Sequence, residues 1–357
     1  MKKVLATILF LLSCPGLKAQ WQYELPAPKP LWVSDTVSVF IMGDVMMHSK
    51  QLDYDCRRFF ARCEHLIKEA DVAAANMEFT LAGEPYTGYP AFSAPDHYAE
   101  YVADCGTNVF LTANNHILDK GAKGLERTLR IYDSMEAGRG ILYTGCAADA
   151  CQDTLRNPLM IDRNGIRLAL VNFTYGTNSG NPASPSPIVK RMNRETVAGM
   201  MKRARENADF VIVLPHWGEE YRLRHNSTQE AWARWLVEQG ASIVIGAHPH
   251  VVQDTTHIAG VPVVYSMGNA VSNMTAQNTR LELAVRFKAI RNWKGEKKIS
   301  EPELVFLWCT VPGMLEDNYS TIPVDEYIGK RELWKNPADY DNMISTLARV
   351  KKETGIE

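Results

Sequence analysis

The sequence is poor in three things: long apolar runs, cysteine, and charge of one sign. No apolar run reaches the roughly 18–20 residues that a membrane-spanning helix needs. The 39 basic and 41 acidic residues leave a net charge of −2. This near balance excludes a strongly basic nucleic-acid-binding surface as the main functional feature of the protein. It also gives no support for attraction to anionic lipid. The rest of the composition, 46% hydrophobic and 22% charged over 357 residues, is ordinary for a globular protein.

Cysteine is too sparse for disulfide bonds to be the main stabilisation of the fold. Seven cysteines in a chain of 357 residues exclude a disulfide scaffold. Cys146 and Cys151 lie five residues apart in a loop-like stretch. They could pair in an oxidising compartment, and buried free thiols are the other interpretation.

The first residues have the pattern of a secretory signal peptide. Lys2 and Lys3 precede an apolar stretch over residues 4–12, which Ser, Cys, Pro and Gly then interrupt. Cleavage after Ala19 predicts a signal peptide over residues 1–19 and an exported protein that is periplasmic, extracellular or on the cell surface. The alternative is a lipobox ending before Cys14, which would anchor the chain through a lipid; the proline after Cys14 disfavours it. The Pro-rich residues 20–35 are expected to be a linker.

Apolar, β-branched runs alternate with segments of helical period, which predicts an α/β fold with buried strands. Strands are expected at about residues 37–43, 71–76, 107–112, 166–173, 209–215, 242–247, 261–267 and 281–288. Helices are expected at about residues 55–70, 96–105, 122–136, 194–207 and 228–239. The Gly-, Ser- and Pro-rich residues 176–190 are expected to form a loop, which could reach over a site through Tyr175, Thr177 and Asn178. Residues 296–357 are expected to be an irregular C-terminal extension with a helix near 339–353.

Polar side chains gather where the predicted strands end, which is where open α/β sheets carry their functional groups. In chain order these residues are Asp44, Asn76, Glu78, Asn114, Asn115, His116, His216, His248, His250 and Asn269. This set of nitrogen and oxygen ligands, without thiolate, suits Mn, Fe, Zn or Mg. It is too large for one ion, and two metals about 3.5–4 Å apart would use it naturally. Such a pair activates water for hydrolysis of phosphoesters and sometimes of amides.

Six motifs in order resemble the CapA/PgsA family of capsule and poly-γ-glutamate biosynthesis proteins. They are Gly43-Asp44-Val45-Met46, Asn76-Met77-Glu78, the run from Ala113 to Gly121, the run from His216 to Tyr221, the run from Gly246 to Gln253, and Tyr265-Ser266-Met267-Gly268-Asn269. The resemblance predicts a family domain over residues 36–295. The family is similar to calcineurin-like metallophosphoesterases, which implies a sandwich of two β-sheets flanked by helices.

The resemblance also implies individual roles. Asp44 matches the metal ligand after the first strand, and Glu78 takes the place of the bridging aspartate. Asn115, His216, His248 and His250 match further metal ligands.

His116 matches the histidine that acts on the leaving group. The departure is at Met46, where metallophosphoesterases have a histidine ligand. His48, two residues later, could substitute for it; without that ligand one metal site is weakened. The expected cofactor is therefore one or two divalent ions, with Mn, Fe or Zn favoured.

Four further residues have two interpretations each. Asp119 could orient His116, as a carboxylate behind a catalytic histidine does, or cap a helix. Asn114 could neighbour the ligands or only form a turn. Glu219 could meet metal or substrate, or lie on a solvated face. Asn269 could bind at the site or shape the turn beside it.

Two functions of different kinds fit these residues. The first is an exported metal-dependent hydrolase that acts on an anionic envelope polymer or peptide, with His116 assisting proton transfer. The second is a non-catalytic polymer-binding or assembly component that works with membrane-bound capsule synthesis proteins; the altered first motif favours it slightly. A secreted nucleotidase or phosphatase is a third option, which rests on fold alone.

Overall fold

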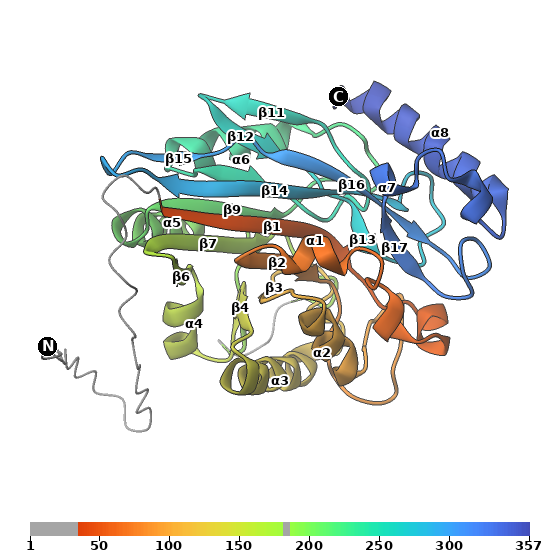
Figure 1. Ribbon diagram of the computed structural model, residues 1–357. Coiled ribbons are helices and arrows are strands. Elements are labelled where there is room, and N and C mark those ends of the chain that lie inside the picture. Colours follow the sequence, from red (N-terminus) through yellow and green to blue (C-terminus); the bar gives the residue numbers. More distant parts are fainter. Residues whose placement is uncertain (1–34, 181–185) are drawn as a thin grey trace, which may run out of the picture. The chain divides into compact units, whose positions relative to one another are not determined.

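Two β-sheets form the centre of the molecule (Figure 1). The computed structural model describes residues 35–180 and 186–357. The predicted signal peptide, the lipobox at Cys14 and the linker up to residue 34 lie outside these residues. Within them, no helix is both long enough and apolar enough to cross a bilayer.

The first sheet has β1 (Asp35–Val45) near its middle. On one side of β1 follow β2 (Val72–Met77), β3 (Val109–Leu111) and β4 (Leu142–Thr144), all parallel. On the other side follow β14 (Leu281–Arg291), β16 (Glu303–Thr310) and β17 (Ser320–Pro323), all antiparallel to their neighbours. The short strands β13 (Asn269–Val271) and β15 (Lys297–Ile299) pair with β1 and β14.

The second sheet runs in the order β11 (Thr255–Ile258), β12 (Val261–Val264), β10 (Ile243–Ile245), β9 (Phe210–His216), β7 (Ile166–Thr174) and β6 (Leu159–Arg163). Its four middle strands are parallel. A separate small ribbon pairs β5 (Cys146–Ala147) with β8 (Ile188–Val189). Cys146 is a buried free thiol that donates to the Thr112 carbonyl, so it is not bridged to Cys151.

Helices pack against the two sheets. They are α1 (Glu64–Lys68), α2 (Asp96–Asp104), α3 (Gly121–Arg139), α4 (Ala150–Arg156), α5 (Arg194–Asn207), α6 (Ser227–Glu238), α7 (Val324–Tyr327) and α8 (Pro337–Thr354). Short 3-10 helices run over Ser49–Asp53, Cys56–Arg58 and Arg331–Leu333.

The alternation along β1 divides the core into layers. Val39 and Ile41 point into the apolar layer between the sheets, where they meet residues of β7, β9 and β14. Phe40 and Met42 point the other way, against α2 and α3. The far face of the second sheet packs on α5 and α6. The predicted α/β sandwich of two sheets flanked by helices is therefore confirmed.

The expectation for the C-terminal residues is wrong in part. The helix near 339–353 is present as α8, but the segment before it is not irregular. β16 and β17 extend the first sheet beyond β14, and α8 packs Met343 and Val350 over the end of the layer between the sheets. The expected helix over residues 55–70 is reduced to the 3-10 turn Cys56–Arg58 and the short α1.

A bulge at Gly43 places the end of β1. The pairing of β1 with β2 shifts between Met42 and Asp44, and the Asp44 N–H donates to the Gly268 carbonyl at 3.0 Å. A Cβ on Gly43 would lie 2.0 Å from that same oxygen. The Gly43 N–H is held from another side by the buried Glu282 carboxylate, at 2.6 Å. Only glycine therefore allows β1 to approach Gly268 this closely.

We expect Gly43→Ala to lower the free energy of unfolding by about 3 kcal/mol, because backbone must move to relieve the overlap. The matched control is Gly138→Ala in α3, where an added Cβ meets nothing within 4 Å. That control should raise stability by about 0.5 kcal/mol, since alanine favours helix more than glycine does. Urea unfolding measures both, and equal changes would contradict the tight contact at Gly43.

Glu282 predicts a specific pH dependence. Burial raises the pKa of Glu282 to about 8, above its ordinary value of 4.5. The unfolded chain loses this proton near the ordinary value, whereas the folded protein keeps it. The stabilisation is therefore complete at acidic pH and is lost as the pH rises toward 8, by at most about 1.4 kcal/mol per pH unit. Urea unfolding of chelator-treated protein between about pH 5 and pH 7 should show this loss, and Glu282→Gln should lack it. Identical pH dependence in the two proteins would refute the shift.

Candidate metal centre

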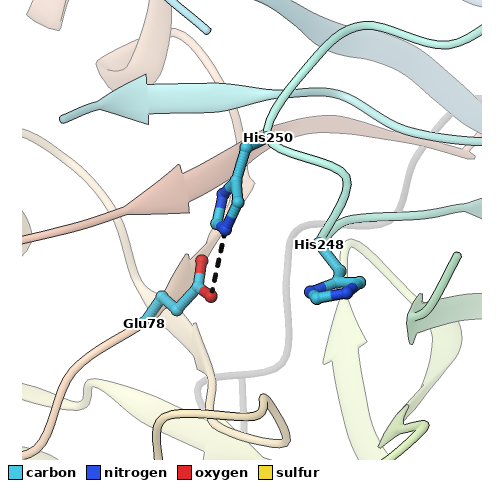
Figure 2. A group of neighbouring side chains, drawn as sticks. All are labelled: Glu78, His248 and His250. Atoms are coloured by element: carbon cyan, nitrogen blue, oxygen red, sulfur yellow. Dashed lines mark ion pairs between the residues drawn. The ribbon is translucent and has the colours of Figure 1, made fainter. Parts of the chain in front are cut away.

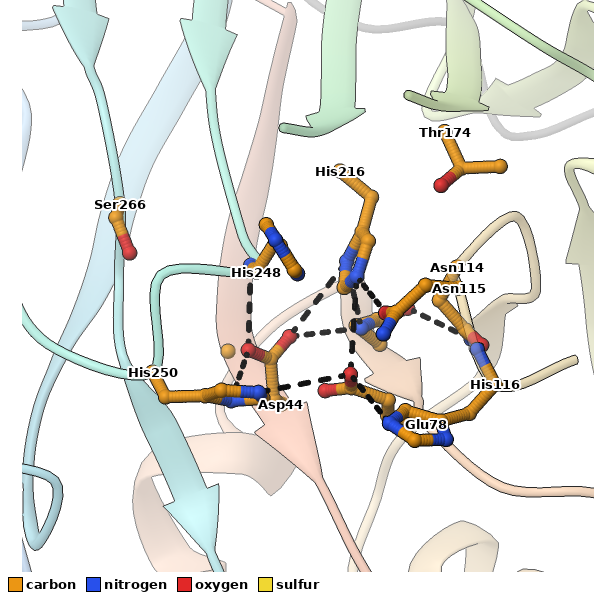
Figure 3. Close-up of polar contacts among 12 residues, drawn as sticks. Asp44, Glu78, Asn114, Asn115, His116, Thr174, His216, His248, His250 and Ser266 are labelled. Atoms are coloured by element: carbon orange, nitrogen blue, oxygen red, sulfur yellow. Dashed lines mark hydrogen bonds and ion pairs between the residues drawn. The ribbon is translucent and has the colours of Figure 1, made fainter. Parts of the chain in front are cut away.

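Seven of the predicted polar residues meet at one place, between the carboxyl ends of the two sheets (Figure 3). Asp44 and Glu78 come from β1 and from just after β2. The others come from the loop after β3, from the end of β9 and from the loop after β10; they are Asn115, His116, His216, His248 and His250. The expectation that the strand ends converge is thus realised in the structure.

The two carboxylates are both fully buried, but they differ in their partners. Asp44 accepts from the Asn76 side-chain amide at 2.7 Å and from the His248 backbone N–H at 3.2 Å. Its Oδ2 also lies 3.4 Å from Nδ1 of His250. Within the described residues, neither oxygen of Glu78 has a hydrogen-bond partner. A buried carboxylate without donors is costly, so Glu78 needs a proton or a cation.

Histidines surround the unpartnered carboxylate of Glu78. Its Oε1 lies 3.7 Å from Nε2 of His216 and 3.9 Å from Nε2 of His250. One ligand atom from each of Glu78, His248 and His250 fits within a mutual distance of 4.8 Å (Figure 2). Nδ1 of His248 is also buried without a partner. These unpartnered carboxylate oxygens and ring nitrogens are suited to bind a divalent ion that prefers nitrogen and oxygen ligands.

Asn115 and His216 are linked directly. The His216 Nε2 and Asn115 Oδ1 atoms lie 2.7 Å apart, and the Asn76 amide lies 3.3 Å from Nδ1 of His216. Because an amide nitrogen can only donate, Nδ1 accepts and Nε2 donates in this arrangement. His216 and Asn115 can both turn to an ion once it displaces their mutual hydrogen bond.

His116 is oriented by a buried carboxylate. Asp119 Oδ2 lies 2.7 Å from Nδ1 of His116 and accepts the Phe92 N–H at 2.8 Å. Asp119 does not cap a helix, because the residue before α3 is Lys120. The Phe92 ring packs edge-on against His116, with centroids 4.7 Å apart. Nε2 of His116 is thereby directed to Glu78, whose Oε1 is 4.0 Å away.

Two ligand candidates have strained backbone. His248 has φ of 100° and His250 has φ of 58°, the left-handed region that non-glycine residues rarely adopt. Strain of this kind is found at functional sites, where the surrounding contacts enforce it. Here the enforcing contacts are the His248 N–H on Asp44 and the Asn269 side-chain oxygen, 2.9 Å from Nδ1 of His250.

Burial sets the protonation of this cluster. It raises the pKa of Glu78 well above the ordinary range, and the neighbouring Asp44 adds to that rise. It lowers the pKa of His216 and His248 well below the ordinary range, and nearby histidines add to the effect. Both histidines are therefore neutral at physiological pH, which is the form that binds a metal.

Three candidate residues remain, and their positions relative to the cluster differ. His48 lies beside the cluster, where its buried Nε2 has no partner and burial lowers its pKa to about 4. Asn114 neighbours the ligand candidates: its amide donates to the Met77 carbonyl at 2.9 Å, and its side-chain oxygen accepts the His116 backbone N–H at 3.1 Å. Glu219 is exposed, 3.9 Å from Arg222, and the structure does not bring it into the cluster.

The loop after β7 reaches the site, as expected. Asn178 donates its backbone N–H to the Asn115 carbonyl at 2.8 Å, and Tyr175 packs on the His248 ring with centroids 4.5 Å apart. Two aromatic residues beside the site, Phe92 and Tyr221, were not predicted from the sequence to lie there. Tyr221 has φ of 66° and lies half-exposed near the His250 ring. An aromatic residue gives no sequence pattern that separates such a position from the core.

Metal content tests the cluster directly. We expect about one or two equivalents of Mn, Fe or Zn in the purified protein by elemental mass spectrometry, and loss of at least one equivalent in His248→Ala. His257→Ala is the matched control, because His257 is half-exposed on β11 beside Glu301. Equal metal content in His248→Ala and in the unmutated protein would contradict the assignment.

Comparisons with known proteins agree with the motif order. The family described as bacterial capsule synthesis protein PGA_cap matches residues 38–274. The capsule biosynthesis protein CapA of Bacillus anthracis is 28% identical over 302 residues, covering 80% of this chain and 72% of that protein. The PGA biosynthesis protein CapA of Bacillus subtilis is 27% identical over 297 residues, covering 78% of this chain and 75% of that protein. The Haemophilus influenzae NAD nucleotidase structure has a TM-score of 0.44 at 13% identity, covering 90% of this chain and 68% of that chain. The family match spans most of the chain, which therefore belongs to the bacterial capsule synthesis protein PGA_cap family.

Proposed function

We propose that this protein is an exported, metal-dependent hydrolase that acts on an anionic polymer of the cell envelope, in capsule or poly-γ-glutamate biosynthesis or processing. The observation that carries the proposal is the buried carboxylate of Glu78, which has no hydrogen-bond partner among the described residues and lies 3.7 Å from the neutral His216. A site for structure alone would have no reason to keep that carboxylate unpaired, because apolar residues in its place would cost less.

Glu78, His248 and His250 would hold one ion, and Asp44, Asn115 and His216 would contribute to a second. A bound divalent ion supplies Lewis-acid polarisation and lowers the pKa of water. The chain's own contribution to proton transfer is His116. Asp119 fixes its Nδ1, so that Nε2 faces the cluster and can give a proton to a leaving group.

The substrate class rests on the relatives. Two of them are named as capsule or PGA biosynthesis proteins, and this chain shares their family. An acidic, glutamate-type polymer or peptide is therefore the favoured substrate, with membrane-bound capsule synthesis proteins as partners. Export rests on the signal-peptide pattern over residues 1–19.

One observation favours a second candidate, a non-catalytic polymer-binding component. Met46 is buried in the apolar layer beneath α2, so the position where metallophosphoesterases carry a histidine offers no nitrogen or oxygen ligand here. Loss of that ligand weakens the second ion and with it the chemistry. His48, with its unpartnered Nε2, is the residue placed to compensate.

Kinetics of two variants distinguish these functions. We expect His116→Ala to lower the rate of hydrolysis of poly-γ-glutamate or of an activated phosphodiester about 10²–10⁴-fold, because it removes general acid–base catalysis. Asp119→Asn should lower the rate as well, since a neutral amide neither fixes the tautomer of the His116 ring nor stabilises its protonated form as the carboxylate does. Both variants should keep their metal, and His257→Ala should match the unmutated enzyme. An unchanged rate in His116→Ala would remove that residue from the mechanism. No turnover in any metal-loaded form would favour the binding component.

A further inference from the structure

We propose that a second site, a cationic cavity between α8 and the loop over residues 272–280, binds the carboxylates of the acidic polymer beside the metal centre. This inference deepens the proposed function and rests on it for the identity of the polymer. Nothing in the metal centre requires this cavity, so its charge needs a separate explanation.

The cavity has a volume of about 410 Å³, which is in the range of small-molecule sites. Its wall is built from the 3-10 helix Ser49–Asp53, the loop between β13 and β14, the end of β16 with the residues after it, and one face of α8. Among the residues that the structure describes, three cations line it, Lys50, Arg280 and Arg349, and no acidic residue does. Amide and hydroxyl groups fill most of the remaining wall, among them Asn273, Gln277 and Thr346.

Two of the three cations are uncompensated. Arg280 is neutralised by Asp339, which it binds through both terminal nitrogens. By contrast, neither Lys50 nor Arg349 forms an ion pair with any residue in the described ranges 35–180 and 186–357. The protein as a whole has a net charge of −2. Two unpaired positive charges facing one hollow therefore form a local attraction for anions.

Arg349 is already ordered for binding. Its Nε donates to Asn278 Oδ1 at 2.9 Å and its Nη2 donates to Thr346 Oγ1 at 3.1 Å. Asn278 itself has left-handed backbone, with φ of 72°. These neutral partners hold the guanidinium in place without cancelling its charge. A fixed guanidinium with amides around it matches a planar carboxylate.

The cavity and the metal centre share two segments. Lys50 follows His48, which lies beside the metal cluster, by two residues. On the other side, the Asn269 amide donates at 3.0 Å to the carbonyl of Thr279, which lies between the wall residues Asn278 and Arg280, while the Asn269 oxygen contacts His250. This arrangement is the one expected if an extended ligand occupies both sites at once. A polymer with a carboxylate on every unit gains affinity from such linked contacts, which a free amino acid cannot do.

The test is binding of fluorescently labelled poly-γ-glutamate to the full chain at low salt, followed by anisotropy. Lys50→Glu should weaken binding at least about tenfold, because it replaces an attraction with a repulsion. Lys50 is exposed, and no structural partner is lost with it. Lys298→Glu, on β15 and outside the cavity wall, makes the same charge change and should leave binding within about twofold.

Three outcomes would overturn the proposal. One is unchanged binding in Lys50→Glu, and another is an equal loss in Lys298→Glu, which would show only a general charge effect. The third is competition by free glutamate as effective as that by unlabelled polymer at equal carboxylate concentration, because the site would then recognise a single small anion. Equal thermal melting temperatures of the variants check that folding is intact.

The outcome is separable from that of the hydrolase proposal. His248→Ala removes a metal ligand but no part of the cavity wall. Polymer binding that persists in His248→Ala supports the cavity even if no turnover is found in any form. Turnover combined with unaltered binding in Lys50→Glu would keep the hydrolase and reject the cavity.

Discussion

The site depends on one constraint, the burial of two carboxylates at the ends of neighbouring parallel strands. Asp44 and Glu78 are shielded from water, and the Asp44 carboxylate adds to the rise that burial causes in the pKa of Glu78. Asp44 is compensated by Asn76, by a backbone N–H and by His250. Glu78 has no such partner. Burial keeps His216 and His248 neutral, so the compensation for Glu78 has to come from a proton or a cation.

The backbone around Asp44 and Glu78 departs from regular geometry, and these departures position the side chains of the site. The bulge at Gly43 brings Asp44 against Gly268, and left-handed backbone turns His248 and His250 back toward the carboxylates. Elsewhere the strands and helices follow their ordinary periodicities. Proteins break local rules mainly at functional sites, where the rest of the fold can support the strain.

Much of this was accessible from the sequence. Strand runs such as residues 166–173 and 281–288 lie within the strands observed, and the polar residues after them do meet. Parallel strands place their carboxyl ends on one side, which is why position along the chain predicted proximity in space.

The features that could not be predicted from the sequence depend on contacts between residues far apart in the chain. β16 is stabilised by pairing with β14 and β17, and its flanking charges conceal it in a local window. The support that Glu282 gives to Gly43 spans 239 residues, and no periodicity encodes it. Phe92 reaches His116 from a loop without regular structure, so nothing in its neighbourhood marked it. Whether His48 serves as a ligand likewise depends on packing, because the backbone at residues 49–53 decides where its ring lies.

The central place of β1 in the first sheet has a consequence for how the protein is made. β1 begins at Asp35, and its antiparallel partner β14 ends at Arg291, with the two terminal residues paired. During synthesis most of the chain leaves the ribosome before β14 has been made. One edge of β1 therefore stays without its hydrogen-bonding partner strand until late in synthesis. The ligand candidates are as widely spread, from Asp44 to His250. Contacts of such long range form slowly, and a metal ion held by these residues would be acquired late, by a nearly complete polypeptide.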